Sequence, residues 1–270
     1  MKKIIFILAG LLLISSLAFA GDDDAPGYQD KSSPNWKEYK SDHFIVHYQN
    51  ASEDFIRQVS NNSEQYYNSI SDDLGFRRFN FWLWDNRANI YIYDNAAGYQ
   101  AGLAMPSWSA GASWPQGKAI YSYSNAQGFL NTVLPHEMGH IIFRELVGVN
   151  NYAIPLWLEE GVASYQMKTK YSEVNRVLKE AIKAGIFMPL DQLSAVDIRT
   201  STDNKKVELF YSEAYSAVDY MIQRFGRDRF VTFCQDLRDN KDLDRAIAAV
   251  YSFNGLKDLS QGWKQSILNE

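Results

Sequence analysis

The sequence is poor in two residue types that carry chemistry. Its single cysteine, Cys234, excludes an intrachain disulfide and any zinc site built on several cysteine ligands. It has four histidines, so any histidine chemistry must be built from His43, His47, His136 and His140. It also lacks a Lys/Arg cluster, and its formal net charge of −5 argues against a nucleic-acid surface. With 46% hydrophobic and 22% charged residues, the composition is that of a folded globular protein.

No apolar run reaches the ~20 residues that a membrane span needs. The longest, residues 4–13, follows Lys2-Lys3 and precedes the small-residue site Ala18-Phe19-Ala20. This order is typical of a secretory signal peptide, which we expect to cover residues 1–20 and to be cleaved after Ala20. No cysteine lies at that site, so a lipoprotein anchor is excluded. We therefore expect an exported protein, periplasmic or extracellular, without a membrane anchor after cleavage.

Residues 21–38 are polar, contain Pro26 and Pro34, and are interpreted as a flexible lead-in. The rest of the chain is interpreted as one domain, residues 39–270. Its first part, 39–125, is rich in strand patterns, and its second part, 126–270, is rich in helix patterns. The fold class expected is α+β: a mixed or antiparallel N-terminal sheet with a helix on it, then a helical C-terminal lobe.

Periodicity gives the individual elements. The first part contains expected strands at residues 43–48, 89–93 and 118–123, and a helix at 52–74 with Ser52 as N-cap. The second part contains expected helices at 128–147, 156–170, 173–184, 207–225, 227–238, 242–251 and 257–268.

Residues 98–117 are rich in glycine, alanine and serine and contain no acidic residue. The segment is either a loop or an edge strand, whose free backbone groups could pair with an extended peptide. In the second case Gly102, Gly111 and Ala112 would let a substrate backbone approach closely, and these are the candidate substrate-binding residues.

The strongest motif is H-E-x-x-H at residues 136–140. Residues four apart lie on the same helix face, so His136 and His140 can both reach one metal ion. Glu137 is then placed to act on a water molecule as a general base. Pro135 removes a helix hydrogen bond, so the helix either bends there or begins there.

Two histidines do not complete a catalytic zinc site, which needs three protein ligands and one open position. No histidine follows His140, which excludes the metzincin pattern with its third histidine. Two carboxylates, Glu159 and Glu160, open the next expected helix. Spacing alone does not choose between them.

The segments H-E-M-G-H and W-L-E-E-G-V-A, residues 136–140 and 157–163, resemble the gluzincin metallopeptidases of the peptidase MA superfamily. The resemblance covers roughly residues 40–268 and extends to the compact peptidase-MA-like domains of exported bacterial proteins. It implies a thermolysin-like catalytic core with zinc at the junction of its two parts, one Zn²⁺ per chain, and Glu160 as the third ligand. The 19 residues between His140 and Glu160 are one more than is typical of aminopeptidase N-type members.

A second catalytic group is also implied by the resemblance. Aminopeptidase N-type enzymes use a tyrosine on a later helix to donate to the oxyanion of the transition state. Tyr211 and Tyr215 lie on such a helix, and the family pattern favours Tyr211. The late histidine that thermolysin-like enzymes use is absent here.

The expected function is hydrolysis of peptide bonds in a peptide or protein substrate, with Glu137 taking the proton of water and passing it to the leaving amine. Aminopeptidase N-type enzymes anchor the substrate amine with the glutamate of a G-x-M-E-N segment, and the corresponding residues 102–107 contain no carboxylate. We therefore expect an endopeptidase. The alternatives are an aminopeptidase and a zinc-containing binding module without activity, and the intact Glu137 counts against the latter.

Overall fold

The computed structural model describes residues 36–76, 82–105, 107, 109–167, 173–199 and 201–269. The expected signal peptide and most of the lead-in lie outside these residues. The strands are β1 (Lys37–Lys40), β2 (Phe44–Tyr48), β3 (Ala88–Tyr93), β4 (Gly111–Trp114) and β5 (Ala119–Tyr123). The α-helices are α1 (Glu53–Asp73), α2 (Ala96–Leu103), α3 (Leu134–Val147), α4 (Leu156–Tyr165), α5 (Val174–Ala184), α6 (Leu190–Leu193), α7 (Asn204–Phe225), α8 (Arg227–Asn240), α9 (Leu243–Tyr251) and α10 (Leu256–Asn269).

The five strands form one mixed sheet in the order β1-β2-β3-β5-β4. The central pairs β2-β3 and β3-β5 are parallel, and the two outer pairs are antiparallel. Side chains alternate between buried and half-buried along β3, as expected of a strand with two unlike faces. Strand β4 occupies one edge of the sheet, and among the described strands it pairs only with β5.

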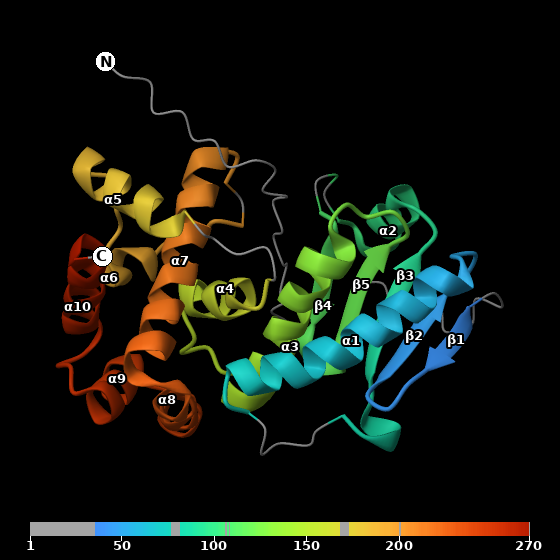
Figure 1. Ribbon diagram of the computed structural model, residues 1–270, viewed down its shortest axis with the longest axis horizontal. Coiled ribbons are helices and arrows are strands. Elements are labelled where there is room, and N and C mark those ends of the chain that lie inside the picture. The colour runs from blue at the N-terminus through green and yellow to red at the C-terminus, as the bar shows by residue number, and fades with distance from the viewer. Residues whose placement is uncertain are drawn as a thin grey trace.

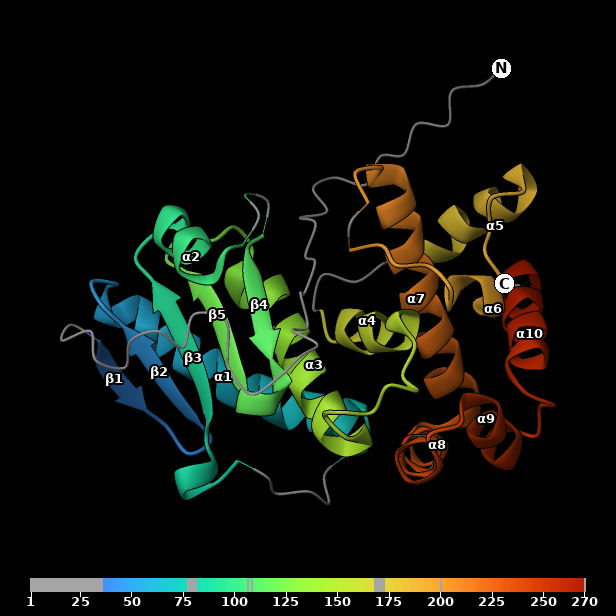
Figure 2. The ribbon, with the colours of Figure 1, turned by 180° about the vertical axis from the view of Figure 1, so that it is seen from behind.

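Helices cover one face of the sheet and part of the other (Figures 1 and 2). Helices α1 and α3 pack on the face that carries Val46, Ile90 and Ile120, whereas α2 packs on the face that carries Tyr91 and Tyr121. Helix α1 begins as the sequence predicts, because the side chain of Ser52 accepts a hydrogen bond from the Phe55 amide.

Helix α3 is preceded by a five-residue π-helix, Phe129–Val133. In it the amides of Val133 and Leu134 donate to the carbonyls five residues earlier, those of Gly128 and Phe129. Pro135 then lies in the first turn of α3, where its missing N–H costs little. The expected helix 128–147 is thus two helical segments, and the π-turn lets the chain pass the proline without a break.

The C-terminal part is helical, as predicted, and stands beside the sheet and its helices in both views (Figures 1 and 2). A single cluster of buried side chains runs from the sheet through α3 and α4 to Trp263 and Ile267 of α10. Among the described residues no helix is both long and apolar enough to cross a membrane.

Three segments differ from the sequence prediction. Residues 98–117 are neither one loop nor one strand, since they contain the end of α2 and the edge strand β4. Strand β1 begins at Lys37, inside the expected lead-in, and all four of its residues are exposed. Helix α4 ends at Tyr165, five residues before the predicted end, and residues 168–170 of that prediction lie outside the described part.

Candidate metal centre

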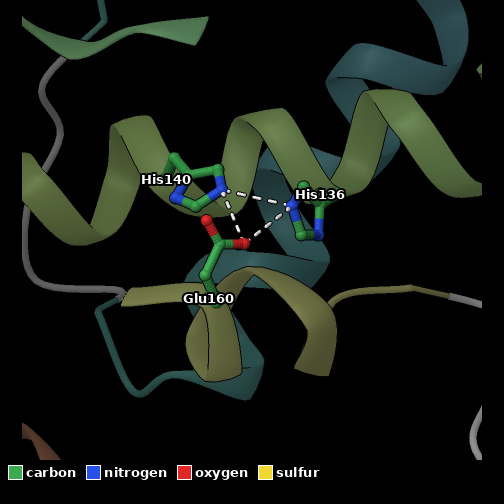
Figure 3. A group of neighbouring side chains, drawn as sticks. All are labelled: His136, His140 and Glu160. Atoms are coloured by element: carbon green, nitrogen blue, oxygen red, sulfur yellow. Dashed lines mark hydrogen bonds and ion pairs between the residues drawn. The ribbon is translucent and has the colours of Figure 1, made fainter. Parts of the chain in front are cut away.

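The two histidines of the H-E-x-x-H motif lie one turn apart on α3 and point the same way (Figure 3). Both side chains are fully buried, and their Nε2 atoms are 3.2 Å apart. At this distance the two nitrogens can share a hydrogen bond, and both can also bind one metal ion placed between them.

Glu160 brings a carboxylate to the same point from α4, which packs against α3 (Figure 3). Its Oε2 lies 3.5 Å from Nε2 of His136 and 3.7 Å from Nε2 of His140. Ligand atoms bound at 2.0–2.1 Å in a tetrahedron are about 3.3–3.5 Å apart, so the three atoms fit a zinc-sized ion. These residues form a candidate metal site whose ligand atoms all lie within 4.8 Å of one another.

Two glycines allow the helices of the site to approach closely. A Cβ at Gly139 of α3 would lie 2.9 Å from Cα of Ala163 in α4. A Cβ at Gly161 of α4 would lie only 2.4 Å from the carbonyl oxygen of Ala214 in α7. The glycine inside H-E-M-G-H and the glycine after Glu160 therefore set the distances between the helices that carry the site.

Glu137 is fully buried between α3 and the edge strand β4. Neither of its carboxylate oxygens has a hydrogen-bond partner within 3.5 Å in the described part of the chain. Burial raises the pKa of Glu137, and the nearby His136, His140 and Ser113 only partly oppose this. The side chain is thus an uncommitted proton acceptor of increased basicity.

The other ring nitrogen of His140 faces a different carboxylate, that of Glu159. Oε1 of Glu159 lies 3.7 Å from Nδ1 of His140, and Arg144 binds both oxygens of Glu159. Burial would raise the pKa of Glu159, but His140 and Arg144 lower it to about 2. Burial would lower the pKa of His140, but Glu160 and Glu159 raise it to about 9.

The two candidate tyrosines occupy different places along α7. The ring of Tyr211 lies 6.5 Å from the ring of His136, between centroids. The ring of Tyr215 instead packs on Tyr165, at a centroid distance of 6.3 Å. Of the two, Tyr211 is the one that the fold brings against a candidate metal ligand.

The candidate substrate-binding residues do not come together. Gly111 and Ala112 lie on β4, where a Cβ at Gly111 would be 2.3 Å from Val133 and 3.6 Å from Cγ of Glu137. Gly102 lies in α2 against Tyr93, on the opposite face of the sheet from α3. The edge strand therefore runs past Glu137, and Gly102 is outside that arrangement.

Sequence reasoning considered Glu159 only as a possible ligand and overlooked Arg144 and Ser113. Arg144 lies four residues after His140, on the same face of α3, and this spacing was the available signal. Ser113 lies two residues from Gly111 on β4, so both side-chain positions face α3. Nothing in the sequence pattern shows that this face meets Glu137.

Comparison with known proteins agrees with this geometry. A family model described as the peptidase MA superfamily matches residues 84–269. That range contains both candidate histidines, Glu137, Glu160 and Tyr211. No curated protein matches the chain.

Proposed function

The chain belongs to the peptidase MA superfamily, and from this premise we propose that it is a zinc metallopeptidase that hydrolyses internal peptide bonds. The observation that carries the proposal is the convergence of His136, His140 and Glu160 at tetrahedral spacing, next to a buried and uncommitted Glu137. A purely structural zinc site would have no use for such a base.

In this proposal His136, His140 and Glu160 hold one Zn²⁺, which when bound supplies Lewis acidity and lowers the pKa of water toward neutrality. Glu137 takes the proton from the attacking water and returns it to the leaving amine. Burial raises its pKa in the metal-free chain, whereas a Zn²⁺ bound nearby would favour the carboxylate form that accepts the proton of water.

Tyr211 is proposed to donate its phenolic proton in a hydrogen bond to the oxyanion of the transition state. The 6.5 Å separation between its ring and that of His136 supports this role. Tyr215 is less suited, since its ring packs on Tyr165.

The proposed substrate is an extended segment of peptide or protein that adds to the edge strand β4. β4 occupies a sheet edge, and at Gly111 it lies beside Glu137. Residues 98–117 contain no carboxylate that could pair with a free substrate amine. An endopeptidase therefore fits this edge better than an aminopeptidase does.

We also propose that the protein is exported, on the basis of the sequence pattern of residues 1–20. Intact-mass measurement after expression in an exporting host tests this. A mature chain that starts at Gly21 is expected, and retention of residues 1–20 would contradict it.

Elemental analysis of purified variants tests the metal site. The wild type should carry about one zinc per chain. Glu160→Ala should lose most of it, and should lose more than Glu159→Ala does. Full zinc in Glu160→Ala together with loss in Glu159→Ala would overturn the ligand assignment, and a wild type without metal affinity would overturn the proposed function.

A further inference from the structure

The two proposed histidine ligands differ in what their second ring nitrogens meet. Nδ1 of His136 is buried and has no hydrogen-bond partner among the described residues. Nδ1 of His140 is also buried, but it faces Oε1 of Glu159 at 3.7 Å. An imidazole can bind a metal through Nε2 only if the proton is on Nδ1, and a carboxylate beside Nδ1 favours that form.

Glu159 is itself held rigidly by Arg144. Nε of Arg144 donates to Oε1 at 2.7 Å and Nη2 donates to Oε2 at 2.5 Å, which is a bidentate pair. Nη1 of Arg144 donates to the carbonyl oxygen of Asn151 at 2.9 Å, and the Asn151 side chain bonds the carbonyls of Val147 and Leu237. One arginine thus fastens α3, the start of α4 and the connection between them.

This arrangement accounts for two adjacent carboxylates with different tasks. Glu160 approaches the Nε2 atoms of both histidines, whereas Glu159 lies on the Nδ1 side of His140 and has both oxygens engaged by Arg144. The Glu159 side chain is only 4% exposed, so its charge acts on His140 with little screening by solvent.

We propose that Glu159 and Arg144 are positioning residues of the metal centre. They hold His140 in the tautomer and orientation that present Nε2 to the metal, and thereby increase the affinity for it. The inference rests on the proposed function, because it concerns the same metal. The inference adds two residues to the metal centre. Neither is a metal ligand, but both affect the affinity for the ion.

The test is a titration of metal-free protein with Zn²⁺ in competition with a chromogenic chelator. Glu159→Gln keeps the shape of the side chain and removes its charge, and Arg144→Lys keeps a charge and removes the bidentate geometry. Both should weaken zinc binding by about 10- to 100-fold, the usual effect of losing a partner of a metal-bound histidine. Glu160→Gln should bind zinc far more weakly than either of these variants.

Glu145→Gln is the matched control, because Glu145 is a partly buried carboxyl on the same helix that bonds Trp82 rather than the site. It should leave zinc affinity unchanged. Circular dichroism and thermal unfolding of the metal-free variants separate positioning from folding. Cobalt(II)-substituted Glu159→Gln should also show a shifted visible spectrum, which a merely structural change elsewhere would not give.

If Glu159→Gln and Arg144→Lys, both folded, bind zinc as tightly as the wild type, the inference is wrong and the proposed function stands. If Glu159→Gln loses metal as completely as Glu160→Gln, Glu159 is a ligand and the inference is again wrong. If the wild type binds no zinc, the proposed function fails first. These three outcomes are distinguishable in one series of titrations.

Discussion

Tyr211 and Tyr215 are a natural pair for a test at the scale of single residues, since both are on α7 and both are about 5% exposed. Tyr211→Phe removes the proposed donor to the oxyanion and should lower kcat by about 100-fold. Zinc content should not change. Tyr215→Phe, the matched control, should stay close to wild-type activity, and a reversed order would move the donor role to Tyr215.

Glu213 is a buried carboxyl on α7 that takes no part in the proposed site. Its Oε1 accepts a hydrogen bond from the Met188 amide at 2.8 Å, and burial raises its pKa to about 8. Because the unfolded chain ionises near pH 4.5, the folded state holds this proton longer, and stability falls as pH rises from about 4.5 to 8.

Glu213→Gln removes this pH dependence. The variant should be more stable than the wild type by on the order of 4–5 kcal/mol at pH 8–9 and equal to it near pH 4.5. Chemical unfolding at both pH values measures the difference. If the wild type and Glu213→Gln have equal free energies of unfolding at pH 9, the pKa of Glu213 is not raised in the folded protein.

At this scale the sequence predicts which residues lie near the metal site better than it predicts the role of each one. The spacing of His136 and His140 on one helix requires them to converge, whatever the rest of the fold does. The choice between Glu159 and Glu160 depends on which way α4 is rotated against α3, and one residue changes that rotation by about 100°. Only the resemblance to a family could favour Glu160 beforehand.

Among the elements, the contact between α4 and α7 depends on Gly161. A Cβ there would lie 2.4 Å from the Ala214 carbonyl oxygen, which is backbone and cannot move aside alone. Gly161→Ala should therefore push α4 away from α7, cost about 1–3 kcal/mol in the free energy of unfolding, and weaken zinc binding through Glu160.

Gly98→Ala serves as the control for this prediction, because a Cβ at Gly98 would meet nothing closer than 3.7 Å. It should be neutral or slightly stabilising, since alanine is the better helix former. Thermal unfolding and zinc titration of both variants give the comparison. A Gly161→Ala protein with unchanged stability and affinity would contradict the close-packing argument.

The long elements of the fold follow from periodicity, and the short ones do not. Helix α1, strands β2, β3 and β5, and most C-terminal helices have clear apolar patterns and were predicted. Strand β1 has the sequence Lys-Glu-Tyr-Lys and is exposed throughout. It therefore lacks the alternation of apolar and polar residues that would predict a strand. Helix α2 is rich in glycine and alanine and packs through Tyr99 and Leu103, which leaves almost no amphipathic signal.

For the whole molecule, the candidate site joins α3, which packs on the sheet, to α4, which packs on the helical part. A metal that binds only the folded chain stabilises it by about 2.7 kcal/mol at a free concentration of 100 times its Kd. Removal of zinc with a chelator should therefore lower Tm by roughly 5–10 °C, reversibly on re-addition. The Tm of His136→Ala should not change on addition of chelator or zinc. If the Tm of the wild type also stays unchanged, the protein does not hold a stabilising metal ion.

The fold class and the placement of the site between its two parts were predictable from the sequence, because a strand-rich half and a helical half meet where the motifs lie. The strand order was not predictable. The pairing of β2 with β3 and of β3 with β5 depends on contacts between residues far apart in the chain, which no local pattern records.

The central claim is most directly tested by a digest of blocked peptides, with products identified by mass spectrometry. Zinc-loaded wild type and Glu137→Gln are incubated with peptides that carry an acetylated N-terminus and an amidated C-terminus, and in parallel with the same peptides unblocked. We predict internal cleavage by the wild type, and a rate at least about 10²-fold lower for Glu137→Gln, which still binds zinc and folds. Equal cleavage by both proteins, or cleavage only at the first bond of unblocked peptides, would contradict the account.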